Sequence, residues 1–237
     1  MIVNYTENGW QVITQRSHGL LAAQICARWK KDKQPGRWMD TLIATAEHDD
    51  VYNELENEEL INENGGPVNF KQTEFEAKRS EALIAMAETK SAFIALLISR
   101  HIQFVHGSEP KAKPFFVKLA NREKDWLQIA NTTKGEISKA YELLEFCDAF
   151  SLLICQQLIQ PEQRKIQISN GPEGEPYEMF ASGDKLIVAP WPFEVASFPV
   201  SYEVRLITQL SFNSSDEFKK EFQKANAMTQ YLTISKS

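Results

Sequence analysis

Residues 45–54, "TAEHDDVYNE", direct the interpretation of the chain, because they place one of its four histidines immediately before two aspartates, Asp49 and Asp50. The histidine, His48, lies near the end of a predicted helix over about residues 38–49. Imidazole beside carboxylate is a donor set that binds transition metals. The surface of an acidic protein also produces this pattern by chance, so the rest of the sequence must decide between the two interpretations.

Similar side chains recur on the inward faces of other predicted helices. His18 shares a helix face with Leu21 and Ile25, because residues three and four positions apart are neighbours on a helix. Asp148 has Leu144 one turn before it, and a carboxylate on such an apolar face requires a metal, a cation or a proton. One metal ion among the helices would explain these residues together. The alternatives are core histidines with ordinary partners and an aspartate paired with arginine or lysine.

Helical periodicity dominates the middle of the chain, and β-rich runs lie at both ends. The predicted helices cover about residues 18–29, 38–49, 73–106 with a break near Thr89, 115–129, 131–159 and 215–228. Asn8-Gly9 predicts an N-terminal hairpin, because both residues accept a positive φ. These patterns predict a mainly α protein: a helical bundle with an N-terminal β-hairpin and a β-rich C-terminal section forming a small antiparallel sheet (α+β). We expect a single domain over residues 1–237, with a helical core at 17–160 and β-rich elaborations at 1–16 and 161–237.

The composition excludes several classes of protein. A net charge of −6 and a pI near 5.4 argue against extended nucleic acid as a partner, which requires a basic face. The apolar runs are too short to span a membrane, and the N-terminus lacks the pattern of a secretory signal. Three cysteines in apolar helical contexts indicate reduced thiols. We therefore expect a cytoplasmic protein with a small-molecule partner; a homodimer through the last helix stays an open alternative.

The order of the candidate ligands resembles that of the HD-domain superfamily of metal-dependent phosphohydrolases. The matching stretches, "SHGLLA", "TAEHDD", "SRHIQFVH" and "EFCDAFSLL", lie within residues 17–158. The resemblance implies an HD-like helical bundle that holds one or two divalent ions of Mn, Fe, Zn or Ni. It implies the following metal ligands: His18, His48, Asp49, His101 and Asp148. The whole chain is also similar to an uncharacterised bacterial family of this length.

The same resemblance implies hydrolysis of a nucleotide or another small phosphoester by a metal-activated water. Asp50 and His106 are the candidate catalytic side chains, and Arg16 and Arg100 are candidates for holding phosphate. Tyr52 occupies the position where these hydrolases often carry a phosphate-binding lysine, which argues against a phosphate contact at this position. Two alternatives remain: an HD-like di-iron oxygenase, and a non-catalytic module that keeps its metal for ligand binding.

Overall fold

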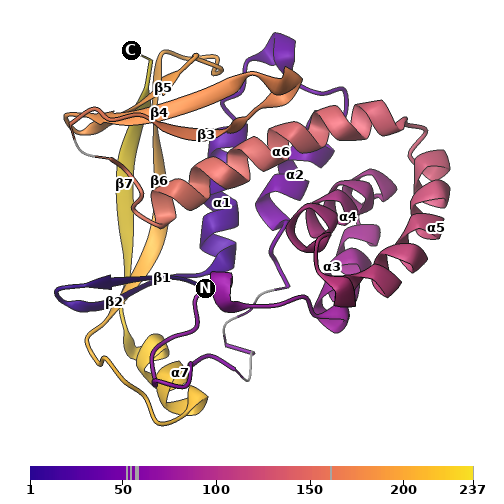
Figure 1. Ribbon diagram of the computed structural model, residues 1–237. Helices are drawn as coiled ribbons and strands as arrows, with labels where there is room; N and C mark the ends of the chain where they lie inside the picture. The colour runs from indigo at the N-terminus through magenta and orange to yellow at the C-terminus, as the bar shows by residue number, and fades with distance from the viewer. Residues whose placement is uncertain (52, 54, 57–58, 161, 237) are drawn as a thin grey trace.

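The chain forms an α+β structure in which a large sheet lies beside a group of helices (Figure 1). The computed structural model describes residues 1–51, 53, 55–56, 59–160 and 162–236. Its strands are β1 (Ile2–Thr6), β2 (Gly9–Ile13), β3 (Ile166–Asn170), β4 (Pro176–Ser182), β5 (Lys185–Ala189), β6 (Ser197–Ile207) and β7 (Ala227–Ser235). Its α-helices are α1 (Gln15–Cys26), α2 (Trp38–Glu47), α3 (Ala77–Glu88), α4 (Ala92–His106), α5 (Lys113–Ile129), α6 (Lys134–Cys155) and α7 (Ser215–Lys224).

The seven strands form one sheet in the order β1-β2-β6-β7-β5-β4-β3, and the sheet curls around its long central strands (Figure 1). All neighbours are antiparallel except β5 and β7, which are parallel. The hairpin turn between β1 and β2 lies at Glu7-Asn8, and Gly9, the first residue of β2, has a φ of +120°. A Cβ on Gly9 would lie 2.2 Å from the carbonyl oxygen of Ile207, so β2 can approach β6 only with glycine here.

The prediction of a mainly α protein with a small antiparallel sheet is wrong, because the sheet is large and mixed. The predicted last helix extended to Met228, but α7 ends at Lys224 and β7 begins at Ala227. This strand lies between β6 and β5, so it joins β1, β2 and β6 to β5, β4 and β3 in one sheet. Its alternating run from Met228 to Ile234 has the β-branched and aromatic residues that favour a strand.

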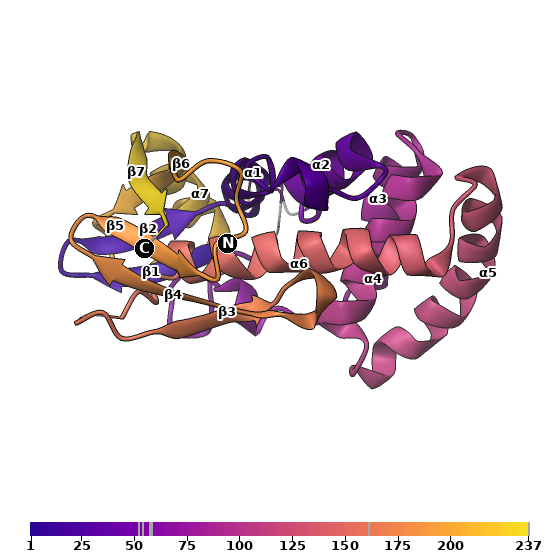
Figure 2. The same ribbon diagram turned by 90° about the horizontal axis from the view of Figure 1, so that it is seen from above.

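Helix α6 connects the sheet to the far helices, as the view from above shows (Figure 2). Its N-terminus is fixed by a capping box between Thr133 and Glu136. Phe146 and Phe150 pack against the sheet-side core, whereas Leu144 belongs to the core among α3, α4 and α5. No helix in the described part of the chain combines the length and apolar character needed to cross a bilayer.

The predicted break near Thr89 is confirmed. Helix α3 ends at Glu88, and α4 begins after Ser91, whose hydroxyl accepts a hydrogen bond from the backbone N–H of Ile94. This cap starts α4 in a new direction and lets its apolar face cover α6.

Helices α1 and α2 approach closely at Gly19, where an added Cβ would lie 2.5 Å from the carbonyl oxygen of Ala46. We expect Gly19→Ala to lower the free energy of unfolding by about 1–3 kcal/mol, because the two helices must separate. Gly36→Ala is the matched control, since no atom lies within 4 Å of its added Cβ. Urea unfolding of both variants tests this, and equal midpoints would show that the close approach is not required.

Candidate metal centre

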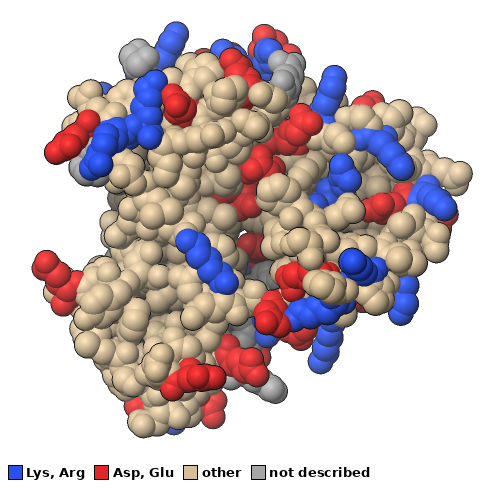
Figure 3. All heavy atoms as spheres, viewed as in Figure 1, with Lys and Arg blue, Asp and Glu red and all other residues tan. Residues whose placement is uncertain are grey.

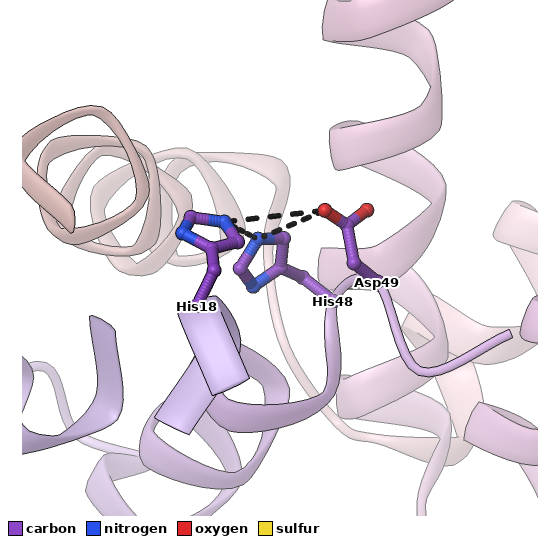
Figure 4. A group of neighbouring side chains, drawn as sticks. All are labelled: His18, His48 and Asp49. Carbon is purple, nitrogen blue, oxygen red and sulfur yellow. Dashed lines mark hydrogen bonds and ion pairs between the residues drawn. The ribbon is translucent and has the colours of Figure 1, made fainter. Parts of the chain in front are cut away.

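Three helices bring the candidate ligands together. His18 lies in α1, His48 is the C-cap of α2, with Asp49 directly after it, and Asp148 lies in α6. The backbone of His48 keeps helical dihedral angles, with φ −59° and ψ −23°, at the point where α2 ends. The side chains of His48 and Asp49 both point toward His18 (Figure 4).

The ligand atoms of these four residues lie close together. The Nε2 atoms of His18 and His48 are 3.1 Å apart. Asp148 Oδ1 lies 3.0 Å from the first and 3.2 Å from the second, and Asp49 Oδ2 lies 4.0 Å and 3.6 Å from the same atoms. Ligand atoms about 2.1 Å from one ion are about 3.0 Å apart at right angles and about 3.4 Å apart at the tetrahedral angle. The observed spacings therefore fit a single divalent ion.

Hydrogen bonds on the far side of each imidazole fix which nitrogen faces the cluster. His48 Nδ1 donates to the carbonyl oxygen of Thr45 at 2.8 Å. The Ser151 hydroxyl donates to the backbone oxygen of Asp148 and so accepts from His18 Nδ1, at 2.8 Å. Both neutral rings consequently turn an unprotonated Nε2 toward the other. Two lone pairs this close, beside carboxylate oxygens, require a cation or a proton between them.

The pKa values of the cluster also indicate that it favours a positive charge. Burial alone would lower the pKa of His48, but the Asp49 and Asp148 carboxylates outweigh it and raise the pKa to about 9. Burial alone would raise the pKa of Asp148, but the facing His48 and His18 rings hold it well below its usual range. The pKa of Asp49 is lowered in the same way: burial alone would raise it, but His48 and His101 outweigh that effect.

His101, on α4, lies at the edge of this group. Its Nε2 is 3.8 Å from Asp49 Oδ1, whereas Asp49 Oδ2 faces the other two histidines. Gln15 Nε2 donates to Asp49 Oδ2 at 2.8 Å. This hydrogen bond holds the carboxylate between His101 on one side and His18 and His48 on the other. His18, His48 and Asp49, and likewise His48, His101 and Asp148, form groups whose ligand atoms all lie within 4.8 Å of one another.

A cavity of about 280 Å³ opens onto the cluster. Asp49, His101 and Asp148 line it, while His18 and His48 lie fully buried behind them. Figure 3 shows a hollow near the middle of this face of the molecule, with acidic side chains beside it. The candidate ion would therefore have protein ligands on its inner side and space for a small molecule on its outer side.

Comparison with protein families gives one match. The family described as "Protein of unknown function (DUF3891)" matches residues 1–209. The chain belongs to this family. The matched region of this DUF3891 protein contains strands β1 to β6 and every residue of the cluster and cavity described above. No curated protein and no solved structure was found to match the chain.

Two arginines and one aspartate predicted for the site lie elsewhere in the DUF3891 chain. Arg16 donates two hydrogen bonds to the backbone oxygen of Asp50, and its Nε lies 3.9 Å from the Asp50 carboxylate. Arg100 lines a separate hollow among α4, α5 and α6. The described lining of the cavity does not include Asp50, Arg16 or Arg100. Tyr52 lies outside the described residues.

His106 lines the cavity. Several other residues that line the cavity were not predicted from the sequence. The missed residues are Gln15, Lys71, Arg79 and Glu109. Only Gln15 had a sequence signal, because it lies three positions before His18 on one helix face. Lys71 belongs to a 3₁₀ helix (Phe70–Gln72) that the Asn69 side chain attaches to the backbone of Val3, a contact between distant segments.

Proposed function

We propose that this protein is a metal-dependent phosphohydrolase acting on a small phosphoester. The observation that carries the proposal is the convergence of His18, His48, Asp49 and Asp148 within ion-binding distance at the wall of a cavity. The order of these residues in the chain, which resembles the HD-domain superfamily, supports the same chemistry. The mixed nitrogen and oxygen donors suit Mn, Fe, Zn or Ni.

In this proposal the protein side chains bind and orient, and the ion supplies the chemistry. A bound divalent ion lowers the pKa of water and neutralises charge on a phosphoryl oxygen. His18 and His48 would hold it through Nε2, and Gln15 would keep the Asp49 carboxylate turned toward it. Lys71 and Arg79, on the wall of the cavity, would attract the phosphate. The proposed location is the cytoplasm, where the three buried thiols would stay reduced.

A di-iron oxygenase is the second candidate, and one feature favours it. The two oxygens of Asp49 face different imidazoles, Oδ1 toward His101 and Oδ2 toward His18 and His48. A carboxylate placed in this way can bridge two ions. The number and identity of the bound metals separate the candidates: two irons support the oxygenase, and a single Mn, Zn or Ni supports the hydrolase.

Activity of metal-loaded protein tests the proposal. Protein stripped with chelator and reloaded with each metal in turn should hydrolyse at least one class in a panel of phosphomonoesters, phosphodiesters and nucleotides. The metal-free protein, and the His48→Ala/Asp49→Ala variant, should be inactive on the same panel. Full metal loading without turnover of any phosphoester would reject the hydrolase and leave the di-iron oxygenase and the non-catalytic metal-binding module.

Lys71 is expected to contribute to substrate binding rather than to metal binding. Its ammonium lies 5.9 Å from the centre of the Phe70 ring and has no carboxylate partner among the described residues. We expect Lys71→Met to raise KM by about 10- to 100-fold, because it removes a hydrogen bond to a charged group, with metal content unchanged. Lys78→Met, at an exposed position of helix α3, is the control. Equal KM values in the two variants would remove Lys71 from the substrate site.

A further inference from the structure

The His106 side chain is fixed by a carboxylate at the end of α4. His106 Nδ1 lies 2.6 Å from Glu109 Oε1, and the other oxygen of Glu109 accepts the backbone N–H of Phe75 at 3.0 Å. The Phe75 ring packs edge-on against the imidazole at 5.5 Å. The chain makes this pair possible by ending α4 at His106 and turning back through Gly107. One nitrogen is therefore occupied, and the ring cannot turn freely.

The second nitrogen of His106 is left for the cavity. His106 and Glu109 line the same cavity as Asp49, His101 and Asp148, and within the described chain Nε2 of His106 makes no hydrogen bond. A histidine oriented by a carboxylate, with its other nitrogen turned to the site of reaction, is an arrangement that transfers protons. The metal cluster does not use this pair, because neither residue belongs to the groups of converging ligands.

The charges of the cavity restrict the anion that it can accept. Its described lining carries four carboxylates and two cations: Asp49, Glu59, Glu109 and Asp148 against Lys71 and Arg79. With one divalent ion bound, its two positive charges are offset by Asp49 and Asp148, and Arg79 is paired with Glu76, so within the described lining Lys71 is the cation left for a substrate. A monophosphate ester brings about two negative charges, fewer than a polyphosphate, and so meets less repulsion from Glu59 and Glu109. A polyphosphate would place further negative charge against the carboxylates.

We infer that the substrates are monophosphate esters of aliphatic alcohols, and that His106 protonates the departing alcohol oxygen while Glu109 positions His106. The inference rests on the proposed hydrolase. An alkoxide is a poor leaving group and needs a proton, whereas a phenolate or a polyphosphate leaves as a stable anion. In the step, the ester P–O bond breaks and a new P–O bond forms to the oxygen of water. Because Nδ1 donates to Glu109, His106 must enter the step with both ring nitrogens protonated. The leaving oxygen takes the Nε2 proton, the attacking water loses a proton to solvent, and His106 regains a proton from solvent. The products are the alcohol and inorganic phosphate.

Leaving-group dependence tests the inference with metal-loaded full-length protein. Wild type should hydrolyse glycerol phosphate and p-nitrophenyl phosphate but not nucleoside triphosphates. We expect His106→Gln to lose at least about 100-fold in kcat on glycerol phosphate but less than about 10-fold on p-nitrophenyl phosphate. Glu109→Gln should show the same asymmetry to a smaller extent. Glu74→Gln, an exposed residue that pairs with Lys111, is the matched control and should behave as wild type.

Metal content and thermal midpoint, measured on each variant, separate chemistry from folding. Equal losses on both monoesters in His106→Gln with full metal content would overturn the role of His106 as proton donor. Hydrolysis of triphosphates in preference to monoesters would overturn the substrate class while leaving the hydrolase intact. A wild-type protein that turns over no phosphoester would reject the proposed function and this inference together.

Discussion

Replacing Asp148 by asparagine is expected to weaken metal binding by more than about 100-fold, since even the loss of an outer-shell partner costs 10- to 100-fold. Asp148 Oδ1 lies within 3.2 Å of both His18 Nε2 and His48 Nε2, so this one atom contacts both imidazoles. The amide keeps the shape of the side chain but not its charge, and the buried site then lacks half of the carboxylates that attract a cation. Titration calorimetry or metal competition on chelator-stripped protein measures the change.

Glu145→Gln is the matched control for Asp148→Asn. Glu145 lies three positions earlier in α6, and it belongs to neither group of converging ligands in the described chain. Metal affinity and activity should stay near the wild-type values in this control. If Asp148→Asn binds metal as tightly as Glu145→Gln, the cluster is not where the ion binds.

Removing the metal is expected to make the stability of the protein depend strongly on pH. The pKa of His48 rises from 6.5 to about 9 in the folded, metal-free protein, because Asp49 and Asp148 outweigh the effect of its burial. A histidine whose pKa is raised in the folded state contributes its full stabilisation of the fold below pH 6.5, and this stabilisation is lost as pH rises through 9. The shift corresponds to a loss on the order of 3 kcal/mol. The lowered pKa values of Asp49 and Asp148 act oppositely, since their contribution is lost as pH falls below about 4.

The metal-bound protein should show the reverse trend at alkaline pH, because a ligating histidine must be neutral and binding therefore tightens as pH rises. Thermal unfolding of stripped and loaded protein between pH 6 and 9 tests both expectations. The gap between the two midpoints should widen across this range, and Asp148→Asn should flatten the slope of the stripped protein. A stripped protein whose midpoint stays constant or rises from pH 6.5 to 9 would contradict the charge assignment of the cluster.

Helical periodicity was sufficient to place His18 and Asp148 on buried helix faces but not to predict the sheet. His18 and Asp148 are recognisable because each shares a helix face with leucine or isoleucine, and such a face must be buried. The predicted last helix extended to Met228, two residues into β7, because the strongly amphipathic α7 immediately precedes this strand, and no strand was predicted over the rest of β7. The large sheet depends on β7, which pairs with both β6 and β5.

The cations that line the cavity could not be predicted from the sequence, because side-chain direction and distant contacts decide which cations reach it. Arg16 lies next to Gln15 in α1, but about 100° around the helix, which turns it toward Asp50 instead of the cavity. Arg100 has the same relation to His101. Lys71 reaches the cavity only because its segment is attached to β1, a contact that no local pattern encodes.

The most direct test of the account is anomalous X-ray diffraction from crystals of protein purified without chelator, measured above and below the absorption edges of Mn, Fe, Ni and Zn. The account predicts a strong anomalous peak within bonding distance of His18 Nε2, His48 Nε2, Asp49 and Asp148. Crystals in which these four side chains surround only water or a proton, with any bound metal located elsewhere, would contradict it.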